Sequence, residues 1–191
     1  MSGFAALTDA EIMLRVKVGD DVAFDHLVEK FRRPLVGFLY RMVRNHAVAE
    51  ELAQEVFLRV YRSRGGYRAS AKFTTWMYRI ATNLAVNYAR DSRGRRGEVS
   101  LDEPSEGGMA FQVADDEPTA EQELLRRERR RAIRHHVEAL PERQRLAVVM
   151  HKYQGLDYRQ IAQVLKLSES ATKSLLFRAY ETLRESLKEF L

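Results

Sequence analysis

The sequence predicts an all-α protein made of two small helical domains joined by an acidic flexible linker. Apolar residues recur at helical spacing along most of the 191 residues, and no stretch alternates convincingly as a strand does. Residues 98–122 break this pattern, since they are rich in acidic, Gly and Pro residues and poor in apolar ones. We therefore expect one domain at 1–97, the linker at 98–122 and a second domain at 123–191.

The first two helices follow from capping and breaking residues. Thr8 and Glu11 have the spacing of a capping box, which predicts a short first helix that ends at residues 19–21. A long amphipathic helix should follow and end near Arg44. Pro34 lies inside it, so we expect a kink or a division there.

Two further helices are expected in the first domain. The third spans about residues 47–63 and ends at the run Arg64-Gly65-Gly66. After a polar loop, Thr74 or Thr75 has the chemistry to cap a fourth helix that ends near Arg90. Together these four helices form the first expected core.

The second domain should begin with a highly charged helix over about 119–140, ended by Pro141. An apolar helix containing Leu146, Val149 and Met150 should follow. Residues 155–183 then have the pattern of a helix-turn-helix, in which two short helices meet at a tight turn.

The helix-turn-helix prediction depends on a cap and on two helix faces. An apolar-faced helix is expected from Tyr158 to Leu165, and Ser168 can cap the next helix. Lys166 stands where many such turns have Gly, so we expect a strained or differently shaped turn. The residues expected to pack inward are Ala171, Leu175, Ala179 and Leu183. Those expected to point outward are Ser170, Lys173, Ser174, Phe177 and Arg178.

The outward face of that second helix has the chemistry of a DNA reader. Lys and Arg neutralise phosphate or bind guanine edges, Ser donates to phosphate, and Phe can contact a thymine methyl group. The alternative is an ordinary solvated helix of a small bundle.

Charge is segregated along the chain. Residues 98–125 contain nine of the 27 acidic residues and none of the 32 basic ones, so the flanking segments are strongly basic. Basic surfaces bind polyanions, although many are only solvated. This distribution favours a nucleic acid as partner.

Enzymatic, metal and membrane functions are not expected. The chain has no Cys, and its His residues lack the spacing of a carboxylate-bridged metal site. No Gly-rich phosphate loop, nucleophile elbow or acid pair is present, which predicts neither catalysis nor a cofactor. No apolar run is long enough to span a membrane.

Two segments resemble one known family. Residues 50–96 contain VFLRVYRSRGGYRASAKFTTWMYRIATN and resemble domain two of an extracytoplasmic-function (ECF) sigma factor of the sigma-70 family. Residues 140–183 contain GLDYRQIAQVLKLSESATKSLLFRAY and resemble domain four. The resemblance implies a bacterial subunit that binds core RNA polymerase, directs it to promoters and assists promoter opening.

The third expected helix is the implied polymerase contact. Leu52, Val56 and Val60 form its core stripe. The resemblance implies that domain two docks on the clamp helices of the largest polymerase subunit and domain four on the flap of the second. The implied polymerase-binding residues are Glu51, Gln54, Glu55 and Leu58. The alternative is a solvated helix face.

The loop and fourth helix of domain two are the implied minus-ten reader. Tyr67 and Phe73 flank a basic loop and could hold a flipped base by stacking. Trp76 is either a wedge between base pairs or a core anchor. The implied residues are Tyr67, Arg68, Lys72, Phe73, Trp76, Arg79, Asn83 and Asn87.

Domain four is the implied reader of the minus-thirty-five element. Its major-groove residues would be Lys173, Ser174, Phe177 and Arg178. Tyr158 and Arg159 would lie near backbone phosphates. The acidic linker would be a tether, or would thread polymerase channels that otherwise hold nucleic acid.

The expected location is the cytoplasm, on the nucleoid or held at the membrane by an anti-sigma partner. Two other functions stay open at this point. One is a sigma-like decoy that binds only an anti-sigma protein. The other is a helix-turn-helix regulator that acts without polymerase.

Overall fold

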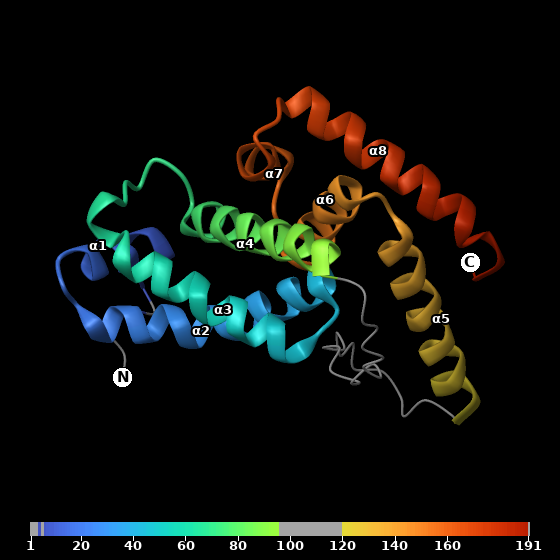
Figure 1. The fold of residues 1–191 in the computed structure, drawn as a ribbon, viewed down its shortest axis with the longest axis horizontal. Helices are drawn as coiled ribbons and strands as arrows, with labels where there is room; N and C mark the ends of the chain where they lie inside the picture. The colour runs from blue at the N-terminus through green and yellow to red at the C-terminus, as the bar shows by residue number, and fades with distance from the viewer. Residues whose placement is uncertain (1–3, 5, 96–119, 191) are drawn as a thin grey trace.

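The computed structural model describes residues 4, 6–95 and 120–190, and within them every regular element is helical, as predicted (Figure 1). The first half contains α1 (Asp9–Lys17), α2 (Asp21–Val43), α3 (His46–Arg62), the short turn η1 (Arg64–Gly66) and α4 (Phe73–Arg95). The second half contains α5 (Ala120–Ala139), α6 (Glu142–Tyr153), α7 (Tyr158–Leu165), α8 (Glu169–Ser186) and η2 (Lys188–Phe190). Most of the predicted linker, 98–119, lies outside the described residues, and its last three residues belong to α5.

Side-chain caps explain where several helices begin. Thr8 and Glu11 form the predicted capping box, and the hydrogen bonds from Thr8 lower the pKa of the Glu11 carboxyl. The side chains of Asp20 and Asn45 accept backbone N–H groups at the starts of α2 and α3. Helix α2 continues through Pro34 and is not divided.

The start of α4 differs from the prediction. The helix begins at Phe73, so neither Thr74 nor Thr75 is its cap, and it continues to Arg95. Thr75 is instead buried, and its hydroxyl accepts a hydrogen bond from Nε2 of Gln160, 3.2 Å away. Thr75 does not cap the helix because its side chain packs against the second half of the chain, and this tertiary contact outweighs its local preference for a cap.

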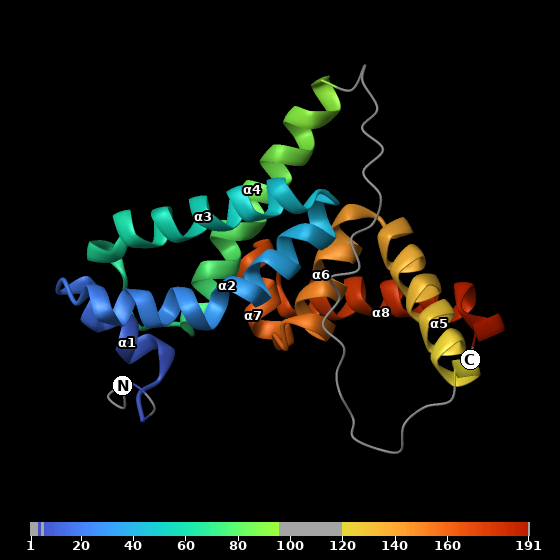
Figure 2. The same ribbon diagram turned by 90° about the horizontal axis from the view of Figure 1, so that it is seen from below.

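The two halves pack against each other through α4 and α7 and through α2 and α6 (Figures 1 and 2). Besides the bond between Thr75 and Gln160, the Tyr78 hydroxyl donates to the side chain of Gln154. Burial raises the pKa of Tyr78 well above its usual value. The guanidinium of Arg41 lies 4.2 Å from the centre of the Tyr153 ring.

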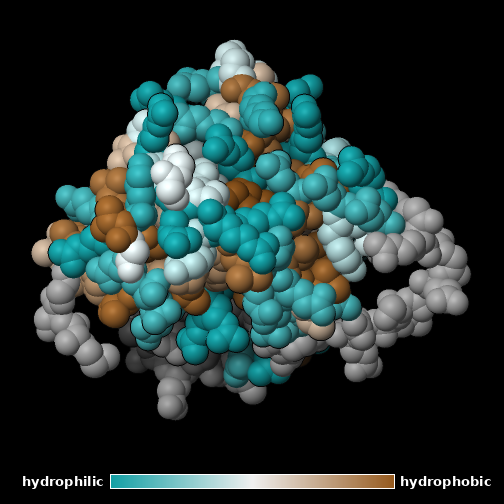
Figure 3. Space-filling model, turned by 60° about the vertical axis from the view of Figure 1, so that its left-hand side comes forward, coloured by the Kyte–Doolittle hydropathy of each residue, from teal (hydrophilic) through white to brown (hydrophobic). Residues whose placement is uncertain are grey.

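Buried side chains from both halves form one continuous apolar cluster. Its largest fully buried members include Phe38, Phe73 and Met77 from the first half and Met150 and Ile161 from the second. Figure 3 shows one face of the molecule, on which polar side chains predominate and apolar ones form small separate patches. None of the described helices combines the length and the apolar character needed to cross a bilayer.

The turn between α7 and α8 has the strained shape that the sequence predicted. Lys166 adopts the left-handed conformation with φ of 54°, and its N–H donates to the carbonyl of Ala162. Ser168 then caps α8, because its hydroxyl accepts the N–H of Ala171 at 3.1 Å. A left-handed residue with a Cβ costs about 1 kcal/mol or more.

We expect Lys166→Gly to raise the free energy of unfolding by up to about 1 kcal/mol, because Gly adopts a positive φ without strain. Gln163→Gly is the matched control, since Gln163 is exposed inside α7, where Gly should cost about 1 kcal/mol. Urea denaturation followed by circular dichroism measures both. Equal destabilisation by the two changes would contradict the assignment of strain to Lys166.

Candidate nucleic-acid interface

Helix α8 presents the outward face that the sequence predicted. Lys173, Ser174, Phe177 and Arg178 are all exposed and surround an open depression of about 520 Å³. Phe177 is 66% exposed, so its ring is accessible to a partner. Nε of Arg178 donates to the carbonyl of Ser174 at 3.3 Å, which directs the side chain along the helix.

The residues that α8 buries are partly different from the predicted ones. Thr172, Leu176 and Ala179 are buried, whereas Ala171, expected to pack inward, is exposed. Thr172 tolerates burial because its hydroxyl donates to the carbonyl of Ser168 at 3.0 Å. Leu175 and Leu183 are partly buried.

Tyr158 and Arg159 open α7 and are exposed beside α8, where the sequence expected phosphate contacts. Tyr158 is 38% exposed, and its ring stacks on the imidazole of His151, with centroids 5.2 Å apart and an interplanar angle of 18°. Asp157 and Gln160 form a capping box at the start of this helix. The side chain of Tyr158 is therefore held at the surface.

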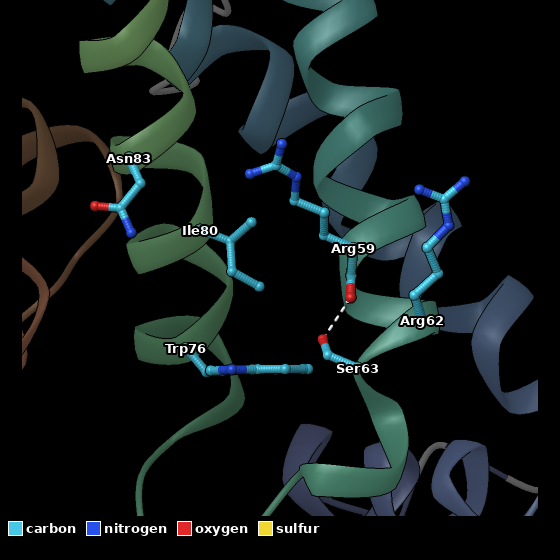
Figure 4. Close-up of a pocket in the computed structure, with 6 residues that line it drawn as sticks. All are labelled: Arg59, Arg62, Ser63, Trp76, Ile80 and Asn83. Atoms are coloured by element: carbon cyan, nitrogen blue, oxygen red, sulfur yellow. Dashed lines mark hydrogen bonds between the residues drawn. The ribbon is translucent and has the colours of Figure 1, made fainter.

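A second candidate surface is a hollow of about 430 Å³ between α3 and α4 (Figure 4). Trp76 and Ile80 point from α4 towards α3, and Arg59 reaches back from α3 towards α4. The hollow thus combines an aromatic wall, an aliphatic wall and positive charge, which are the groups that bind unstacked bases. Its lining consists of Arg59, Arg62, Ser63, Trp76, Ile80 and Asn83.

Two predicted base-stacking residues do not face this hollow. Tyr67 and Phe73 are 3% and 1% exposed, so the prediction that their rings are open to a base is wrong for this structure. They pack on Trp76, with ring centroids 5.1 and 6.2 Å away. Burial accordingly raises the pKa of the Tyr67 hydroxyl. The sequence left Trp76 as either a core anchor or a wedge between base pairs. The structure shows that it packs on the core through Tyr67 and Phe73 and also lines the hollow.

The remaining minus-ten candidates are exposed. They are Arg68, Lys72, Arg79, Asn83 and Asn87, of which Asn83 is the one in the hollow. Sequence reasoning missed Arg59, Arg62 and Ser63, which end α3. The sequence feature that could have indicated them is a pair of Arg residues three positions apart, which lie on one helix face just before the loop.

The predicted polymerase contact forms a continuous strip on α3. Glu51 and Gln54 are exposed, and Leu58 is 48% exposed. Glu55 accepts a hydrogen bond from Nε of Arg59 at 2.6 Å, so this acid also touches the edge of the hollow. In the described part of the chain, no three His, Asp or Glu side chains are grouped as a metal site.

Comparison with known families identifies both halves. Residues 27–95 match the family Sigma-70 region 2, and residues 130–183 match Sigma-70, region 4. The first covers α3 and α4 with the hollow, and the second covers the helix-turn-helix.

Relatives match along nearly the whole chain. The RNA polymerase sigma-H factor of Pseudomonas aeruginosa is 34% identical over 187 residues, which cover 96% of this chain and 95% of that one. The ECF RNA polymerase sigma-E factor of Haemophilus influenzae is 33% identical over 187 residues, with 97% and 98% covered. The chain belongs to the sigma-70 family of RNA polymerase sigma factors, and within that family to the ECF group.

Solved structures share the fold. The chain matches CnrH, solved in complex with the cytosolic domain of CnrY, with a TM-score of 0.68 and 19% identity over 95% of this chain and 97% of that one. It also matches the sigma factor RpoE of Bartonella quintana, solved in complex with the anti-sigma factor NepR, with a TM-score of 0.64 and 20% identity over 86% and 96%. As a sigma factor, the protein acts in transcription initiation and is not itself an enzyme.

Proposed function

We propose that this sigma factor reads two promoter elements with the two surfaces described above. The α8 face with Lys173, Ser174, Phe177 and Arg178 binds the minus-thirty-five element in the major groove. The hollow between α3 and α4 captures the melted non-template strand of the minus-ten element. The observation that carries this proposal is that both surfaces are accessible and combine Arg residues with an aromatic ring, although one lies on α8 and the other between α3 and α4.

The chemistry of the hollow supports strand capture. An unstacked base needs an apolar face to replace its neighbour, and Trp76 and Ile80 supply one. Its phosphate needs a cation, which Arg59 or Arg62 can supply, and its edge needs an amide such as that of Asn83. Duplex DNA cannot place a base there without opening.

Reading both elements requires the two halves to separate. The positions that name the two elements are about 25 base pairs apart, or about 85 Å of duplex at about 3.4 Å per pair. A folded chain of this length is only about 40 Å across. The predicted linker of about 25 residues can span up to about 80 Å, so it is long enough to tether the parted halves.

Helix α3 supplies the polymerase contact in this proposal, through Glu51, Gln54, Glu55 and Leu58. Domain four docks on the flap of the second large subunit. The structures of similar fold that were solved with an anti-sigma factor, or with the cytosolic domain of another protein, support a further partner of that kind. We place the protein in the cytoplasm, on the nucleoid when active.

Trp76→Ala should weaken holoenzyme binding to a promoter whose minus-ten strand is already melted by about 1 to 3 kcal/mol, the stacking energy of one base. Because Trp76 also packs on Tyr67, Asn83→Ala serves as a second variant at an exposed position. Phe190→Ala is the control aromatic, since it lies in η2 and outside the hollow. Unchanged affinity in both hollow variants would remove the strand-capture role.

Arg178→Ala should weaken promoter use by about 1 to 3 kcal/mol if Arg178 makes a bidentate contact to one base. Promoters are first mapped by transcript starts after overexpression. Run-off transcription on single-base variants of the upstream element then measures preference. An unaltered preference with uniformly weaker binding would reassign Arg178 to a phosphate.

Glu55→Lys should lower the affinity for core polymerase by about tenfold or more, because it reverses one charge in the docking strip. Binding of the upstream duplex by the second half should stay unchanged. Glu29→Lys is the charge-matched control on the exposed surface of α2. Fluorescence titration with labelled core enzyme distinguishes them, and equal affinities would exclude Glu55 from the contact.

Cross-linking the two halves should abolish promoter-dependent transcription. Arg44 and Glu138 form an ion pair of 3.5 Å between α2 and α5, and the chain has no Cys, so the pair Arg44→Cys and Glu138→Cys is unique. A short cleavable bismaleimide joins them, and reduction of its disulfide should restore run-off transcription. Each single-Cys variant is a control. Full activity of the cross-linked chain would show that separation is unnecessary.

A further inference from the structure

A cluster of three rings joins helices α6, α7 and α8 of the second half, next to the surface proposed to bind duplex DNA. His151 lies in the last turn of α6, Tyr158 is the first residue of α7, and Tyr180 lies in α8. The sequence prediction used neither His151 nor Tyr180. Both are partly buried, so their side chains are available for packing and hydrogen bonding but not for extensive contact with DNA.

The geometry of the cluster fixes the imidazole on two sides. Nδ1 of His151 is hydrogen-bonded to the Tyr180 hydroxyl at 2.6 Å. The same imidazole stacks on the Tyr158 ring at 5.2 Å and 18°. The Nζ of Lys152 lies 5.6 Å from the centre of the Tyr180 ring. Tyr180 thus anchors the imidazole, and the imidazole supports one face of Tyr158.

Support of this kind matters because of where Tyr158 lies. Tyr158 is 38% exposed, and an exposed aromatic side chain exchanges between rotamers unless a neighbour holds it. A phenol hydroxyl binds a phosphate through one directional hydrogen bond, so the ring must be held in one rotamer to bind well. The stacked imidazole supplies that restraint.

We propose that His151 is a positioning residue for DNA binding, which holds the Tyr158 hydroxyl towards a backbone phosphate of the upstream element, and that Tyr180 anchors it. The inference rests on the function proposed for α7 and α8. It adds two residues, from helices α6 and α8, that set the phosphate contact without touching DNA.

The role is geometric and not electrostatic. Burial, and secondarily the charge of Lys152, lower the pKa of His151, which favours the neutral imidazole. A residue that neutralises phosphate changes the salt dependence of binding by about one counterion, whereas a neutral positioning residue leaves it unchanged. These two roles can therefore be separated by a salt titration.

The test is a double-mutant cycle in the full chain bound to core polymerase, with a duplex carrying the mapped upstream element as the probe. His151→Ala and Tyr158→Phe should each weaken binding about three- to tenfold, the loss expected for one hydrogen bond. In the Tyr158→Phe background, His151→Ala should cause little further loss. The salt slope should be the same in parent and His151→Ala.

Tyr180→Phe removes only one oxygen, so it tests the same cluster even if His151→Ala does not fold. It should weaken binding in the same direction, again only while the Tyr158 hydroxyl is present. His135→Ala is the matched control, because His135 is an exposed His of α5 outside the cluster. Losses that are equal in both Tyr158 backgrounds would show general destabilisation and overturn the inference.

Failure of the inference and failure of the proposed function give different results. If the parent holoenzyme shows no preference for the upstream duplex, the proposed role of α8 is wrong. If it has the preference and Arg178→Ala removes it, while Tyr158→Phe or His151→Ala leaves affinity unchanged, only the positioning role is wrong. Loss in all three variants, with a non-additive pair, supports both.

Discussion

The buried contact between α4 and α7 is the constraint on which the rest of the structure depends. On one side of α4, Thr75 and Tyr78 bond to Gln160 and Gln154 and close the two halves into one core. On another side, Trp76 lines the hollow next to α3. Because successive positions of a helix point in different directions, one helix can hold the second half and also form a nucleic-acid surface.

In the proposed function the two halves part on the promoter, so promoter binding competes with the packing of α4 on α7. Polar contacts such as that between Thr75 and Gln160 are satisfied only while the halves touch, and water can replace them when the halves part. These polar contacts lie beside apolar side chains of both halves that share one core, so parting the halves also exposes apolar surface to water.

The match between sequence and structure differs from element to element for physical reasons. Local signals, namely the Thr8 capping box, the Ser168 cap and the strained turn at Lys166, were predicted correctly because each involves residues close in the chain. Ala171 was assigned to the wrong face, because a Thr can replace an apolar residue when its hydroxyl bonds within the helix. Tyr67 and Phe73 were expected at the surface but are buried, because Phe73 packs on Phe31 of α2 and Tyr67 packs on Trp76.

The sequence by itself determined the helical class, the family, the exposed face of α8 and the acidic strip of α3, since each follows from period, caps and charge along one segment. Only the tertiary structure decided that Trp76 lines the hollow, that Arg59 and Arg62 line it too, and that the His151 imidazole stacks on Tyr158. These depend on distances between side chains of different helices. A single sequence carries no measure of such distances until its helices are packed.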